Sequence, residues 1–137
     1  MAEPGTHVFA VRVYYEDTDA AGIVYYANYL KFAERARTEW LRSHGIGQRA
    51  LAEQESVAFA VRRLAIEYLK PARLDDIIEV RTRIVHVGGA SIDAEQELRR
   101  EGEIIAQMMV TLACVGSTGK PARLPPAVRH AVGLDSP

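Results

Sequence analysis

The sequence has little sulfur and no concentration of metal ligands. It contains one cysteine in 137 residues, Cys114, and four histidines that stand far apart. A single cysteine excludes an intrachain disulfide and a cysteine-based zinc cluster. The histidines have no ligand-like spacing, so the sequence indicates neither a metal site nor a metal cofactor; they are His7, His44, His86 and His130.

The chain also lacks an excess of either charge and any long apolar run. It carries 17 basic and 18 acidic residues, which gives a net charge of −1 and no reason to expect nucleic-acid binding. No apolar stretch approaches the ~20 residues of a membrane-spanning helix. Met1 to Gly5 lack the basic and apolar regions of a signal peptide. We therefore expect a cytoplasmic protein without an integral membrane segment.

What is present predicts one α+β domain over residues 1–137. Apolar residues at helical spacing predict one long helix over 26–44, with Tyr29 and Trp40 in the core. The spacing allows ion pairs Arg35–Glu39 and Glu34–Arg37, although Glu34 could equally reach a buried partner. Shorter helical pieces are expected within 46–55 and in the tail 124–137, near 127–131. Strands are predicted over 8–15, 57–69, 76–87, 91–100 and 104–115. Short links favour antiparallel pairing, so we expect one long helix packed against a five-stranded antiparallel sheet.

Alternating apolar residues predict the register of the strands 76–87 and 91–100. Placing their apolar faces together pairs Ile84 with Ala94 and Val80 with Leu98, and puts Gln96 on that same face. The same register brings three opposite charges together on the other face, as Arg83–Glu95, Arg81–Glu97 and Glu79–Arg99. A two-residue turn at Gly88-Gly89 would shift this register by one, so a three-residue loop or a bulge at Ala90 is predicted.

Two carboxylates stand where the first strand joins the long helix. Asp17 and Asp19 are followed by Gly22, three residues after the second carboxylate. Free N–H groups at a helix start stabilise developing negative charge, so a carboxylate beside them can act on an electrophile held there. The alternative for Asp19 is a capping or Asx-turn role. Gly22 is interpreted as a position for a left-handed turn or for close substrate approach.

The segment from Tyr15 to Tyr29, followed by residues 32–37, closely resembles the hotdog-fold acyl-CoA thioesterases. The nearer branch is the YbgC-type, which is associated with the Tol-Pal system, and the 4-hydroxybenzoyl-CoA thioesterases are related to it. A second match lies at Glu67-Tyr68 and residues 71–76, and the resemblance runs from about Val11 to Leu124. It implies a sheet wrapped around one helix, and dimers, often paired into tetramers, with active sites at the dimer interface.

The resemblance also implies roles for single residues. Asp19 would be catalytic, either attacking the thioester carbonyl or activating water, while the backbone amide of Tyr26 polarises the carbonyl oxygen. Gly22 and Tyr25 would contact substrate, and Lys120 and Arg123 are candidates for the coenzyme A phosphates, although scattered solvated charge is as good an interpretation of either.

One residue departs from the branch that the chain resembles most. Tyr26 stands where the YbgC-type branch usually has histidine, and the hydroxybenzoyl branch has tyrosine there. A phenol titrates far above neutrality and cannot shuttle protons at pH 7. The chemistry is therefore left to Asp19 and the backbone amide.

The expected substrate is an acyl-CoA or an acylated acyl carrier protein, with no cofactor beyond the coenzyme A that belongs to the substrate. Two alternatives remain: a hotdog dehydratase, which needs a histidine beside the carboxylate, and a non-catalytic acyl-thioester-binding or scaffold protein of a membrane-linked complex. A homodimer, and in the family often a tetramer, is expected because one helix cannot cover both faces of five strands.

Overall fold

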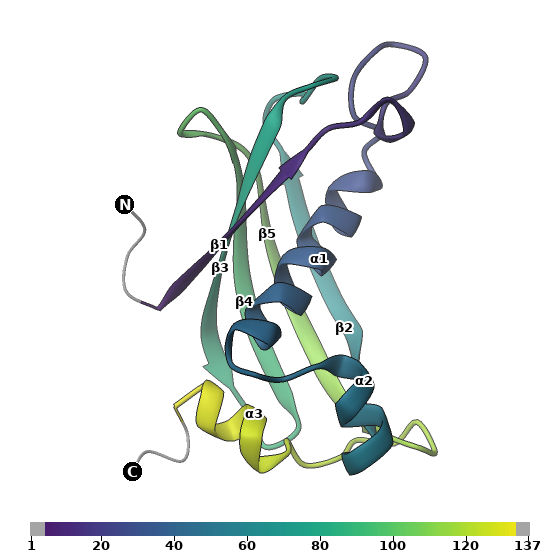
Figure 1. Cartoon of the computed structure of the whole chain (residues 1–137), viewed down its shortest axis with the longest axis vertical. Coiled ribbons are helices and arrows are strands. Elements are labelled where there is room, and N and C mark those ends of the chain that lie inside the picture. The colour runs from purple at the N-terminus through teal and green to yellow at the C-terminus, as the bar shows by residue number, and fades with distance from the viewer. Residues whose placement is uncertain (1–4, 134–137) are drawn as a thin grey trace.

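The computed structural model describes residues 5–133, and an antiparallel sheet of five strands forms its framework (Figure 1). In chain order the strands are β1 (Thr6–Arg12), β2 (Val57–Tyr68), β3 (Ile77–Val87), β4 (Ser91–Arg100) and β5 (Glu103–Gly116). Their order across the sheet is β1-β3-β4-β5-β2, so β1 and β2 are the two edges. The first strand ends earlier than predicted, because residues Tyr15–Asp17 form a 3-10 turn, η1.

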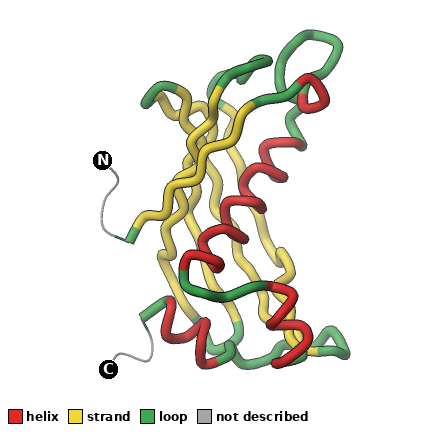
Figure 2. Tube along the Cα trace, viewed as in Figure 1, coloured by secondary structure: helices red, strands yellow, loops and turns green. Residues whose placement is uncertain are grey.

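One long helix, α1 (Asn28–Ser43), crosses one face of this sheet (Figures 1 and 2). It begins two residues later than predicted, since the Asn28 N–H donates to the Tyr25 carbonyl and closes a turn before the helix. The predicted shorter pieces are α2 (Gln48–Ala50), a single wide turn η2 (Leu51–Glu55) and α3 (Pro126–Ala131). The last part of the predicted tail, residues 134–137, lies outside the described residues. The architecture is the α+β arrangement that the sequence predicts.

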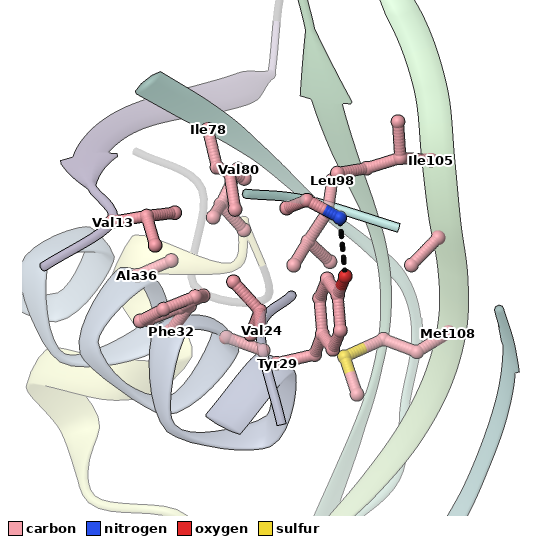
Figure 3. Packing of buried hydrophobic residues seen from close by; sticks show 13 residues of the cluster. Val13, Val24, Tyr29, Phe32, Ala36, Ile78, Val80, Leu98, Ile105 and Met108 are labelled. Carbon is pink, nitrogen blue, oxygen red and sulfur yellow. Dashed lines mark hydrogen bonds between the residues drawn. The ribbon is translucent and has the colours of Figure 1, made fainter. Parts of the chain in front are cut away.

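The core lies between α1 and the sheet. Tyr29, Phe32 and Ala36 of α1 pack against Val80, Leu98 and their neighbours in a cluster that Figure 3 shows from close by. A second cluster around Trp40 and Ile92 continues the core toward α3. Full burial of a side chain of this size is worth roughly 1.5–3 kcal/mol. Tyr29 and Trp40 are thus confirmed as core residues.

The predicted register of β3 and β4 is confirmed at all five pairs, but the predicted bulge lies elsewhere. Ile84 pairs with Ala94, whereas His86 pairs with Asp93, so the extra residue is Val85 rather than Ala90. The Gly88 N–H donates to the Ser91 carbonyl, which closes a two-residue turn at Gly89-Ala90. The strand, and not the turn, therefore takes up the odd residue.

The two ion pairs that the helical spacing allows do not form on α1. Arg37 is not paired with Glu34 on the surface but is only 8% exposed, and its Nη1 donates to Gln96 Oε1 at 2.9 Å. Arg35 lies over the Phe32 ring, and Glu39 pairs with Arg42. Helical spacing alone cannot decide which long polar side chain turns inward, because the deciding partner, Gln96, comes from a distant strand.

Gln96 is a fully buried amide at the centre of a polar group inside the core. Its Nε2 donates to the Ala33 carbonyl and to Thr82 Oγ1, both at 3.0 Å, while its Oε1 accepts from Arg37. The sequence alternation correctly placed Gln96 on the inner face. These bonds join α1, β3 and β4 through side chains, and they satisfy an amide that would be costly to bury alone.

Candidate active site

Asp17 holds the loop between β1 and α1 in place. Its Oδ2 accepts the Tyr14 N–H at 2.8 Å, and its backbone carbonyl accepts the Tyr25 N–H and the Asn28 side-chain amide at 3.0 and 2.9 Å. The first turn of α1 is thereby tied to the loop. Both groups of Asp17 are occupied within the chain, which makes it a structural residue of this site.

Asp19 lies in the same loop with one carboxylate oxygen engaged and the other open. Oδ1 accepts the Ala21 N–H at 2.8 Å, the Asx-turn geometry that was the alternative interpretation of the sequence. Oδ2 has no hydrogen bond within residues 5–133, and the side chain is exposed in the single chain. The turn orients the carboxylate without using its second oxygen. The Asx-turn role and a catalytic role of Asp19 are therefore compatible.

Gly22 makes the tight turn that returns the chain from Asp19 toward the helix. Its φ is +80°, which side-chain-bearing residues rarely adopt, and its N–H donates to the Asp19 carbonyl at 3.0 Å. The Asp19 N–H in turn donates to the Ile23 carbonyl at 2.9 Å. The left-handed turn that the sequence predicts is therefore present, while contact with a substrate stays a prediction.

Tyr26 lies two residues before Asn28, the first residue of α1. No hydrogen bond within the described part of the chain occupies its backbone N–H, whereas its carbonyl accepts the Tyr68 hydroxyl at 2.8 Å. Tyr26 is 61% exposed, although it is an apolar position at the start of the helix predicted over 26–44. An amide at a helix start that lacks an internal partner can bind an anionic oxygen.

Two aromatic rings contact the Tyr26 side chain. The Tyr25 and Tyr26 ring centroids are 4.8 Å apart, and the neighbouring Tyr26 phenol raises the pKa of Tyr25 above its ordinary value. The Tyr68 ring contacts the Tyr26 ring edge-on. Burial raises the pKa of Tyr68 above its ordinary value, and electrostatic interaction with Tyr26 and Tyr29 raises it further. Tyr29 is buried below, with its hydroxyl accepting the Ala72 N–H, the dashed line in Figure 3.

An apolar groove of about 240 Å³ is lined by Tyr26 and its neighbours; its walls come from Ile23, Val24, Tyr26, Tyr29, Tyr68, Leu69, Lys70 and Pro71. Among these residues only Tyr26 was predicted as a site residue, and Tyr68 is the one that contacts it directly. It stands in the second matching segment, Glu67-Tyr68, but only the three-dimensional contact with Tyr26 shows what it does. The groove, the open Asp19 oxygen and the free amide lie in one region of the surface.

Lys120 and Arg123 are not part of this region within one chain. They follow β5, whose last residue, Gly116, pairs with Val57 at the start of β2, whereas Tyr68 is the last residue of β2. A strand of this length extends roughly 35–40 Å. The turn after β5 accordingly lies at the opposite end of the molecule from the Asp19 loop (Figure 1).

No histidine lies in the loop that carries Asp19. The His44 ring contacts the Trp40 ring edge-on, near the far end of α1. His7 lies in β1, and its buried Nδ1 has no hydrogen-bond partner within the described residues. Burial lowers the pKa of His7. Within residues 5–133, no three histidine, cysteine or acidic side chains gather as metal ligands. In the same residues, no helix has the length and apolar character that crossing a membrane requires.

Known proteins resemble this chain over nearly its whole length. The model of the thioesterase-like superfamily matches residues 13–132. The acyl-CoA thioesterase YbgC of Haemophilus influenzae is 48% identical over 124 residues, covering 90% of this chain and 91% of that protein.

Two solved structures agree with this. A probable thioesterase from Bartonella henselae has a TM-score of 0.85 at 39% identity, covering 88% of this chain and 99% of that one. A 1,4-dihydroxy-2-naphthoyl-CoA thioesterase from Synechocystis has a TM-score of 0.88 at 25% identity, covering 97% and 100%.

Proposed function

This chain belongs to the thioesterase-like superfamily, and we infer that it is an enzyme that hydrolyses acyl-CoA thioesters to a free acid and coenzyme A. The observation that carries this inference is the 48% identity to the H. influenzae acyl-CoA thioesterase over 90% of the chain. The family match spans residues 13–132 and so includes the loop from Asp17 to Tyr26. The fold is the hotdog fold of that family.

We propose that the Tyr26 amide binds the carbonyl oxygen of the thioester. As the carbonyl carbon is attacked, its oxygen gains negative charge, and a fixed N–H at a helix start stabilises that charge more than it stabilises the neutral ground state. The free Tyr26 N–H and the anchoring of its carbonyl by Tyr68 support this assignment. Gly22 and Tyr25 would border the bound thioester.

Asp19 supplies the second half of the proposed mechanism, in one of two ways. As a nucleophile, its free oxygen forms a bond to the carbonyl carbon, the carbon–sulfur bond breaks, and water then hydrolyses the anhydride. As a general base, it takes a proton from a water molecule that attacks the same carbon, and that proton passes to the leaving thiolate. Both routes require the open Oδ2.

The complete site is proposed to need two chains. β2 is an edge strand, and exposed alanines along it, at 58, 60 and 65, leave room for a second strand to approach. If two copies pair through β2 around a two-fold axis, the strands run antiparallel and the Val57 end of one meets the Tyr68 end of the other. The partner's Lys120 and Arg123 would then approach the groove, where they could bind coenzyme A phosphates.

The test is thiol release from a panel of acyl-CoA substrates of different chain length, with aliphatic and aromatic acyl groups. Turnover of at least one member is expected. A folded protein that binds acyl-CoA but releases no thiol would instead be the non-catalytic acyl-thioester-binding protein. Measuring the same acyl group on acyl carrier protein decides which carrier the enzyme uses.

A further inference from the structure

A second cavity lies under the other half of α1, away from the Asp19 loop of the same chain. It has a volume of about 230 Å³, and most of its wall is apolar, formed by Trp40, Leu41, Phe59, Ile84, Ile92 and Leu112. Exposed Glu34 and Gln48 lie at its rim. The proposed mechanism makes no use of this space.

Arg37 puts a positive charge at the wall of this cavity. The residue is more than nine-tenths buried, and burial lowers its pKa, with nearby Glu34 opposing the effect. A buried arginine still carries its charge. No carboxylate within residues 5–133 forms an ion pair with it, and Glu34 on the rim is not within salt-bridge distance. The charge thus lacks the compensation that buried charges ordinarily have.

The Arg37 guanidinium also has N–H donors that make no hydrogen bond within residues 5–133. Only Nη1 is used, toward Gln96 Oε1 at 2.9 Å. The other two guanidinium nitrogens make no hydrogen bond in the described chain, and neither is fully buried. Arg37 is also one of the residues that line the cavity. A planar guanidinium with free donors matches a carboxylate in geometry and charge.

We propose that this cavity is a binding site for a short apolar carboxylic acid, whose carboxylate is held by Arg37 and whose tail lies among Trp40, Phe59 and Leu112. At ~30 Å³ for each water-sized group, the volume corresponds to roughly the size of a six-carbon acid. A thioesterase releases an acid of this kind. The identification of the bound acid with this enzyme's own product rests on the proposed function. The existence of the binding site does not depend on that function.

The test compares hexanoate with hexanamide, which has nearly the same shape and no charge, by titration calorimetry with the whole wild-type protein at pH 7. Hexanoate should bind on the order of tenfold more tightly or better, because charged hydrogen bonds exceed neutral ones in strength. Equal binding of the two, or no binding of hexanoate, would overturn the proposal without any variant being made.

Three variants locate the site. Arg37→Met should remove the preference for hexanoate, whereas Arg35→Met, a matched change on the exposed side of the same helix, should leave it intact. Ala94→Leu keeps Arg37 but fills the cavity, and should abolish binding of both compounds. Hexanoate binding that survives in both Arg37→Met and Ala94→Leu would mean that the acid binds elsewhere.

Thiol release separates this inference from the proposed function. A wild-type protein that cleaves acyl-CoA but does not prefer hexanoate to hexanamide contradicts the acid site alone. One that prefers hexanoate, in a manner that depends on Arg37, but cleaves no acyl-CoA contradicts the proposed function alone.

Discussion

The Tyr68 hydroxyl donates a hydrogen bond to the Tyr26 backbone carbonyl at 2.8 Å, and so joins the last residue of β2 to the start of α1. These residues are 42 positions apart in the chain. The bond fixes the backbone of the residue whose amide is proposed to bind the thioester oxygen. The position of that amide is thus set by the sheet as well as by the loop.

Tyr68→Phe should therefore lower kcat several-fold and cost about 0.5–1.5 kcal/mol of stability, the usual net value of one hydrogen bond. The ring contact with Tyr29, at 5.3 Å between centroids, is retained in this variant. Thiol-release kinetics and urea unfolding measure the two effects. An unchanged kcat with reduced stability would show that the bond serves the fold alone.

Asp19→Asn should reduce kcat by on the order of 10²–10⁴-fold with little change in KM, since it removes nucleophilicity and basicity while keeping the shape. Asp17→Asn is the matched control. Its carbonyl contacts to Tyr25 and Asn28 survive the change, so its kcat should fall by less. A folded Asp19→Asn enzyme with near wild-type kcat would overturn the assignment.

Substitutions of Tyr26 test whether its phenol takes part in the chemistry. Tyr26→Phe and Tyr26→His are expected to change kcat modestly, because the backbone amide is present in every variant, and Tyr26→Ala should mainly loosen the packing with Tyr25 and Tyr68. The measurement is kcat and KM beside a thermal melt. If Tyr26→Phe folds but is inactive, the phenol is a catalytic group.

Sedimentation tests the proposed pairing through β2. The wild-type protein should be at least a dimer at micromolar concentration, and Ala60→Glu on β2 should shift it toward monomer, because a charge on a strand edge opposes pairing. Ala10→Glu places the same change on an exposed alanine of the other edge strand, β1, and should not alter the assembly. A monomeric wild-type protein contradicts the proposal.

His7 should make folding stability depend on pH. Burial holds the pKa of His7 below its ordinary value of 6.5, an effect that Glu39 opposes and His44 reinforces. Between the two pKa values the unfolded chain binds a proton at His7 that the folded chain does not. The contribution of neutral His7 to folding stability is therefore complete above pH ~6.5, and it is lost as the pH falls through the lower pKa of His7 in the folded chain. Urea unfolding between pH 5 and 8 should show a steeper loss for wild type than for His7→Phe.

The sequence predicts those features that depend on local alternation, and it misses those that depend on distant partners. The β3–β4 register followed from side-chain alternation and charge, since a slip of one residue would reverse every face. The bulge was misplaced because Gly88-Gly89 marks a turn but does not say how the strand reaches it. At the proposed site, the motif points to Asp19 and Tyr26, whose catalytic roles stay predictions. The contact of Tyr68 with Tyr26 and the inward turn of Arg37 could be found only in three dimensions.

The buried amide of Gln96 has a consequence for how this chain can change by mutation. It bonds to Arg37 on the helix and to Thr82 on another strand, so replacing Gln96 by an apolar residue leaves both without this partner, and replacing Arg37 or Thr82 leaves part of the buried Gln96 amide without one. Each single step is costly, although an apolar set of similar volume would pack well. We therefore expect positions 37, 82 and 96 to vary together, either kept as this polar set or replaced together by an apolar one.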